Sequence, residues 1–172
     1  PLLYEGRMVP QVVHEETIDR YFDKICGWMS DAQRADMKKK FSHADQLNQT
    51  QQRIYAIAWD ISQHFRENWQ GSKFKAQLVA PRKRIAILYK QYLDEIGIVS
   101  SEVLITSPDT REGEDEAFGE TSNVEVAFWK RMMDEHGTAK KYEASIINRF
   151  KNSDKPEIII VVDKLLTGFD EP

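Results

Sequence analysis

The sequence predicts an α/β protein in which a parallel sheet is flanked by helices and preceded by an α-helical block. Two observations carry this prediction. Apolar residues recur with helical spacing between residues 15 and 70. After Gly71, three short apolar runs alternate with helical segments. Strands separated by helices pair in parallel through right-handed crossovers, so the second part of the chain is expected to form a doubly wound sheet.

The helical block follows a short extended segment, residues 1–14. One helix face is marked by Ile18, Tyr21, Phe22, Ile25, Trp28 and Met29. Ser30-Asp31-Ala32-Gln33 fits a capping box and predicts a second helix to about Phe41. A longer third helix is expected over about Ala44–Trp69, where Gly71-Ser72 ends it.

Three strands are predicted in the remainder, at Phe74–Ala80, Glu102–Thr106 and Ile158–Val162. The last is β-branched at every position, as expected of a buried strand.

Helices are predicted between these strands. Pro81 suits the first turn of a helix that ends at Gly97. Ser107–Thr121 reads as a polar loop, and Ser122-Asn123-Val124-Glu125 as a capping box that opens a helix to about Glu135. Tyr142, Ile146, Ile147 and Phe150 mark one more helix.

Composition excludes several classes of protein. The 172 residues carry 24 basic and 28 acidic side chains, a formal net charge of −4. The longest apolar run, Ile158–Val162, is far below the roughly 20 residues that span a bilayer. A single Cys26 excludes a disulfide framework within the chain, and no signal peptide is visible, so we expect a cytoplasmic protein. Because the chain starts at Pro1 and stops soon after a strand, we expect a piece of a longer protein.

No catalytic or metal site is predicted. The chain has no G-x-x-x-x-G-K-[ST] phosphate loop, and its four histidines are scattered. Asp134-Glu135-His136-Gly137 resembles the acidic box of a nucleoside triphosphatase. It follows a segment with helical periodicity rather than a strand, so we interpret it as a polar helix end before Gly137.

A basic cluster follows the first predicted strand. Arg82, Lys83 and Arg84 fall in the first turn of the next helix, where cations do not help stability because the helix N-terminus is already electropositive. The same place suits an anion, since parallel sheets bind ligands at their carboxyl edge. Two interpretations stay open: a solvated basic surface, or contact with phosphate, more readily a nucleic-acid backbone than a small nucleotide.

A second cluster of polar groups follows the last strand. Thr167, Gly168 and Asp170 place a hydroxyl, a flexible backbone position and a carboxylate within four residues. They can serve a phosphate or a ribose hydroxyl, or they can form an ordinary polar turn in which Asp170 caps the next element.

The segment Val162–Pro172 resembles motif V of superfamily 2 helicases, in the form found in the motor (R) subunit of type I restriction-modification enzymes. Leu2–Arg7 and the motif IV-like strand Phe74–Ala80 are similar to the same family in the same order, as is Tyr142–Lys151. The resemblance covers nearly the whole chain.

The resemblance implies a division into three parts. Residues 1–14 would end a preceding motor domain, 15–70 would form a helical connector, and 71–172 would be a second RecA-like motor domain, truncated at its C-terminal end. The parent protein would be a site-specific deoxyribonuclease and ATP-dependent DNA translocase that uses ATP and Mg²⁺. Its partners would be duplex DNA and the methylation and specificity subunits.

The resemblance also implies roles for single residues. Thr167 would touch the DNA backbone, and Arg82, Lys83 and Arg84 would lie along the DNA path. Gly168 and Asp170 would face the ATP cleft. The chain lacks the phosphate loop, the acidic box and the nuclease centre, so it is expected to hold no cofactor and to be inactive alone.

An alternative from another class is a non-catalytic α/β protein-interaction module. In that interpretation the helical block docks a partner through Trp59 and Trp69, and the acidic stretch Asp109–Glu120 contributes to the contact.

Overall fold

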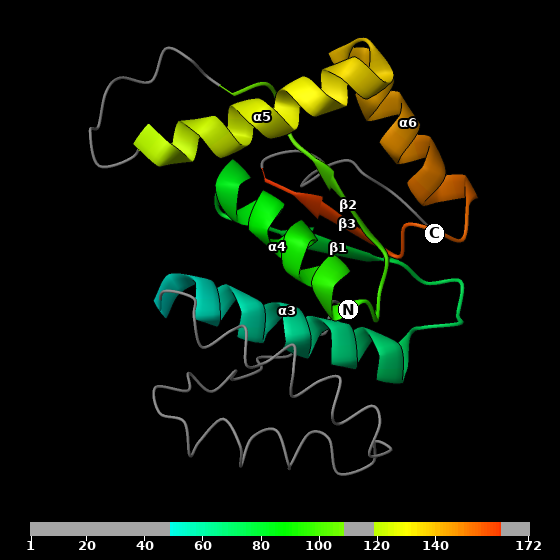
Figure 1. Cartoon of the computed structure of the whole chain (residues 1–172). Helices are drawn as coiled ribbons and strands as arrows, with labels where there is room; N and C mark the ends of the chain where they lie inside the picture. The colour runs from blue at the N-terminus through cyan, green and yellow to red at the C-terminus, as the bar shows by residue number, and fades with distance from the viewer. Residues whose placement is uncertain (1–48, 109–118, 163–172) are drawn as a thin grey trace. The chain divides into compact units, whose positions relative to one another are not determined.

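The computed structural model describes residues 49–108 and 119–162 (Figure 1). The expectations for residues 1–48, for most of the acidic stretch and for Thr167, Gly168 and Asp170 therefore lie outside the described residues. The chain divides into two compact units, Pro1–Asp60 and Ile61–Pro172, with the division inside helix α3 (Gln49–Asn68).

The second unit is built on a three-stranded parallel sheet. Its strands are β1 (Ala76–Val79), β2 (Ser101–Leu104) and β3 (Ile158–Val161), in the spatial order β1-β3-β2. In the register, Ala76 and Ser101 lie on either side of Ile158. The α/β class and the parallel pairing predicted from the sequence are confirmed.

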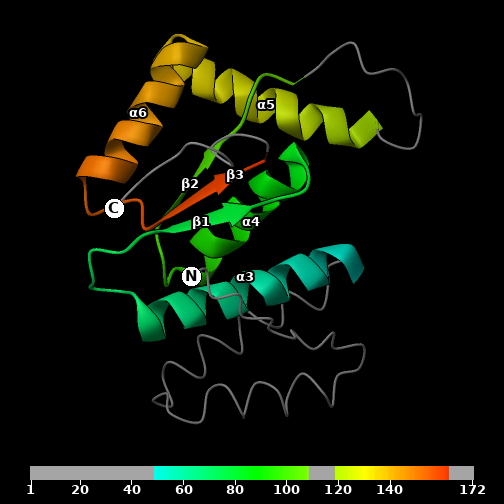
Figure 2. The same cartoon turned by 180° about the vertical axis from the view of Figure 1, so that it is seen from behind.

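Three helices flank this sheet: α4 (Lys83–Ile96), α5 (Gly119–His136) and α6 (Ala139–Asn152). Helix α4 packs on β2 and β3 and also contacts α5, which in turn contacts α6. Comparison of Figures 1 and 2 shows α4 on one face of the sheet and α6 along its flank beside β2.

The core is centred on β3. All four of its side chains are fully buried, because a central strand is covered on both edges and both faces. From α4, Ala86, Leu93 and Ile96 are also buried. Their spacing is that of one helix face, which explains why this segment is helical and why it lies on the sheet.

Helix α4 ends as predicted. Gly97 adopts a left-handed backbone with φ of 69°, and its N–H donates to the Leu93 carbonyl. Glycine is favoured there because a side chain strains this conformation. The acidic Asp134-Glu135-His136 string is likewise a helix end before Gly137, which has φ of 79°.

Other boundaries differ from the prediction. The capping box at Ser122–Glu125 is wrong, because α5 already begins at Gly119 and Glu125 lies within the helix. The expected loop Ser107–Thr121 is correspondingly shorter. The strands are also shorter than predicted. Each strand has four residues, because the parallel pairing of β1 and β2 with β3 extends over only that length.

No helix in the described part of the chain is both long enough and apolar enough to cross a membrane.

Candidate nucleic-acid interface at the carboxyl edge of the sheet

The three strands end at one edge of the sheet because they are parallel. Val79, Val161 and Leu104 lie in register there. The ladder extends one residue further, where the Ala80 N–H donates to the Val161 carbonyl at 2.8 Å. The chain segment that follows β1 therefore begins beside the end of β3.

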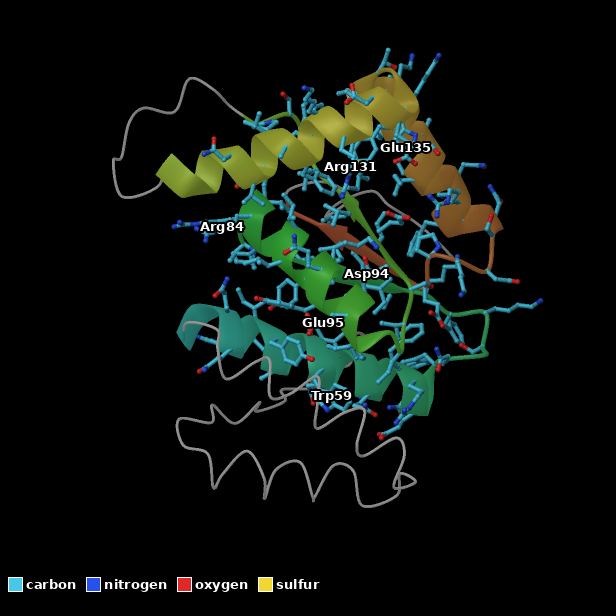
Figure 3. All side chains as sticks on the ribbon, in the orientation of Figure 1. Trp59, Arg84, Asp94, Glu95, Arg131 and Glu135 are labelled. Atoms are coloured by element: carbon cyan, nitrogen blue, oxygen red, sulfur yellow. The ribbon has the colours of Figure 1, made fainter. Side chains whose placement is uncertain are left out.

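The basic cluster lies at this edge. Arg82 is the N-cap of α4, with an extended backbone, and its side chain is exposed. The prediction that Pro81 and Arg82 fall in the first turn is wrong by one or two residues: the helix begins at Lys83, and Pro81 precedes the cap. Figure 3 shows the Arg84 side chain at the start of α4, directed away from the sheet.

Two contacts fix the start of α4 to its neighbours. The Lys83 Nζ donates to the carbonyl oxygen of Ser107, beyond β2, at 2.7 Å. The backbone N–H of Arg84 donates to Glu125 Oε1 of α5 at 2.9 Å. The first turn of α4 holds no acidic residue of its own, so α5 supplies the carboxylate that the positive helix end favours.

Glu125 and Ser107 were missed as parts of this site. Glu125 is an acidic residue among apolar neighbours, which marks it in the sequence. The capping-box pattern, however, indicated a role at the start of its own helix and not a contact with α4. Ser107 contributes only a backbone carbonyl, which no sequence pattern marks.

The second predicted cluster cannot be placed, since Thr167, Gly168 and Asp170 lie outside the described residues. Val162 is the last described residue before them, and it is buried at the same edge of the sheet as the basic cluster. The expectation that both clusters share one edge stays a prediction.

The opposite edge of the sheet holds a half-buried polar network around Glu157. Its carboxylate accepts from the Ser100 N–H at 2.7 Å, from the Ser100 hydroxyl at 2.9 Å and from Gln70 Nε2 at 3.1 Å. Burial raises the pKa of Glu157, but these hydrogen bonds and the charge of Lys155 outweigh it, so the pKa lies below its ordinary value. The network joins the starts of β2 and β3 to the turn after α3, which is a structural role.

Among residues 49–108 and 119–162, no three His, Cys, Asp or Glu side chains are grouped so that they could hold a metal ion.

The tryptophans named for the alternative module differ in exposure. Trp59 is 1% exposed, so it is not a surface anchor, whereas Trp69 is 43% exposed and contacts Phe74 edge-on.

Residues 63–172, which include the whole sheet and the basic cluster, match the protein family described as type I restriction enzyme subunit R domain 3. The chain belongs to this family. The match confirms the resemblance to type I restriction R subunits on the part of the sequence that contains both site clusters.

Similar proteins occur in the archaeon Methanocaldococcus jannaschii. A protein named as type I restriction enzyme MjaIXP endonuclease subunit is 25% identical over 176 residues, which cover 100% of this chain and 15% of that relative. The MjaVIIIP endonuclease subunit is 28% identical over 179 residues, covering 93% of this chain and 16% of its own length.

The chain thus spans about a sixth of the length of these two relatives. No solved structure matches it.

Proposed function

We propose that this R-subunit domain contributes part of the DNA path and one wall of the ATP cleft in a type I restriction enzyme that translocates along DNA. The observation that carries the proposal is the position of Arg82, Lys83 and Arg84 at the carboxyl edge of the sheet. This edge is where open parallel sheets bind their ligands. It also adjoins the end of β3, which leads into the motif V-like segment.

The chemistry of the cluster suits a phosphate backbone. An ammonium group has three donors, and the Lys83 Nζ uses one of them on Ser107, so two remain for phosphate oxygens. Arg82 is exposed, and a guanidinium has a forked arrangement of donors that matches phosphate oxygens. Contacts of this kind position a protein on the duplex and read little sequence, as a motor that steps along DNA requires.

We propose that Gly168 and Asp170 face the bound nucleotide. Thr167 is proposed to contact the DNA backbone. The described residues lack a carboxylate cluster that could hold Mg²⁺. We propose that other parts of the R subunit hold most of ATP and Mg²⁺, because the stabilisation of phosphoryl transfer is divided between two motor domains. We propose that residues 71–172 form the second RecA-like domain and that the chain alone does not hydrolyse ATP or cut DNA.

The partners of the whole enzyme are proposed on the same basis. They are duplex DNA and the methylation and specificity subunits, and the proposed location is the cytoplasm.

The test is duplex-DNA binding by the chain, measured by fluorescence anisotropy at several salt concentrations. Arg82→Glu with Lys83→Glu should weaken binding equally for unrelated sequences and lower the slope of log affinity against log salt by about 2. Arg53→Glu with Lys73→Glu makes the same change of charge at two exposed positions outside the cluster. Equal loss in both variants, or none in the first, would remove the cluster from the DNA path.

A further inference from the structure

The outward face of α6 is strongly basic. Tyr142, Ile146 and Phe150 point into the core and are buried. The opposite side of the helix, here called the α6 outer face, consists of exposed residues: Lys140, Lys141, Ala144, Asn148, Lys151 and Asn152. Both views of the fold show α6 on the outside of the sheet (Figures 1 and 2).

Negative charge is absent from the α6 outer face. The one carboxylate in the helix, Glu143, is half-buried at its flank. The nearby Glu102 of β2 is bound by Arg149 at 3.1 Å. Among the described residues, neither the Lys140 nor the Lys141 ammonium forms an ion pair. The start of this face therefore carries two ammonium groups, those of Lys140 and Lys141, that pair with no carboxylate of the described residues.

Helix stability does not account for the first two lysines. Lys140 and Lys141 lie in the first turn of α6, which contains no acidic residue. Cations there oppose the helix dipole and cost free energy. The helix end is already capped, because the Thr138 hydroxyl accepts from the Lys141 N–H at 3.3 Å.

The polar groups extend along the whole helix. From Lys140 to Asn152 the face measures about 18 Å, at 1.5 Å per residue. Asn152 Nδ2 donates to Asn148 Oδ1 at 2.8 Å, which orients the two amides side by side. Ala144 lies between the lysines and the amides, and its small side chain allows an approaching backbone to come close. Lysine ammonium and asparagine amide groups are common donors to phosphate oxygens.

The composition of the face favours a nucleic acid over a protein partner. Protein interfaces have a desolvated core that is enriched in aromatic side chains. The α6 outer face has no aromatic and no large apolar residue. Interfaces with DNA are more polar and much more positive.

We propose that the α6 outer face binds the phosphate backbone of duplex DNA, as a second contact surface besides Arg82–Arg84. The proposal rests on the proposed function, since it assumes that the R-subunit domain lies along DNA. The proposed surface lies on a different helix from the basic cluster. The duplex would therefore contact α6 as well as the start of α4.

The test uses the 172-residue chain and short fluorescent duplexes of two unrelated sequences. Lys140→Gln with Lys141→Gln should weaken binding to both and lower the salt slope by about 2. Lys140→Arg with Lys141→Arg keeps the charges and should bind like the unmodified chain. Arg53→Gln with Lys73→Gln is the matched control for two lost charges, and circular dichroism checks that each variant is folded.

The outcomes separate this inference from the proposed function. Unchanged binding by Lys140→Gln/Lys141→Gln, with a clear loss in Arg82→Glu/Lys83→Glu, overturns the α6 surface alone. No effect of either change, or no binding by the unmodified chain at low salt, overturns both. A variant that binds DNA normally but loses a methylation or specificity subunit would show a protein-docking surface instead, and would also overturn the inference.

Discussion

The Glu125 carboxylate of α5 accepts a hydrogen bond at 2.9 Å from the backbone N–H of Arg84 in the first turn of α4. The two residues are 41 positions apart in the sequence. Because α4 lacks an acidic residue in its first turn, this carboxylate balances a helix end that also carries cationic side chains. This contact links α5 to the start of α4, where the basic cluster lies.

Replacing Glu125 should destabilise the domain. Glu125→Gln keeps an acceptor oxygen but removes the charge, and Glu125→Ala removes both, so we expect losses of about 0.5 and about 1–2 kcal/mol. Urea unfolding measures both. Asp134→Asn, an exposed position on the same helix, controls for the change in net charge. Equal losses from Asp134→Asn and Glu125→Gln would show that net charge, and not the contact with Arg84, is responsible.

Tyr142 should contribute through its hydroxyl as well as its ring. The hydroxyl donates to the Val103 carbonyl, and burial, together with the charge of Glu102, raises the pKa of Tyr142 above its ordinary value, so the donor stays protonated. Tyr142→Phe removes this buried hydrogen bond, and we expect a loss of about 0.5–1.5 kcal/mol. The measurement is the denaturant midpoint at constant m-value. A loss below about 0.5 kcal/mol would contradict a role for the hydrogen bond.

Glu157 should make stability depend on acid pH. Its folded-state pKa lies below its ordinary value, so its contribution is fully present above the unfolded-state pKa of about 4.3. The contribution is lost as pH falls through the lower folded-state pKa. Glu157→Gln should therefore be less stable than the unmodified chain at neutral pH, and the difference should shrink as the solution is acidified. A difference that stays constant from neutral to strongly acid pH would contradict this linkage.

The central strand should be far more sensitive to truncation than the edge strand. Ile160 is fully buried, whereas its partner Leu78 on β1 is only half-buried. Ile160→Ala is expected to cost about 3–5 kcal/mol and Leu78→Ala about 1–2 kcal/mol. Thermal unfolding of both variants tests the order. Similar losses would indicate that β1 is covered as completely as β3.

The sequence was most informative where local chemistry decides the structure. The β-branched run from Ile158 predicted the buried strand, and Gly97 predicted the end of α4, because each depends on the residue's own backbone preference. The parallel pairing followed from strands alternating with helices. The spatial order β1-β3-β2 was not predicted, since it depends on pairing between segments that lie far apart in the sequence.

The candidate site was predictable only in part for the same reason. The position of Arg82–Arg84 after β1 is local, so the sequence placed it within one or two residues. The contact between Glu125 and Arg84 joins distant segments, and the Ser-x-x-Glu pattern indicated a helix start instead. There, a tertiary contact to α4 outweighs the local preference, and α5 begins a turn earlier at Gly119. Lys140 and Lys141 were not singled out, because a charged helix face becomes informative only when its exposure is known.

The order of the strands also bears on how the domain is made. Strands β1 and β2 do not touch each other, and both pair with β3, which comes last among the three in the sequence. During synthesis, neither of the first two strands has its partner until Ile158–Val161 has left the ribosome. The sheet therefore closes late, across a long stretch of chain, and non-local pairing of this kind slows folding. Until then β1 and β2 lack the strand with which they pair, and an unpaired strand edge is a place where chains can aggregate.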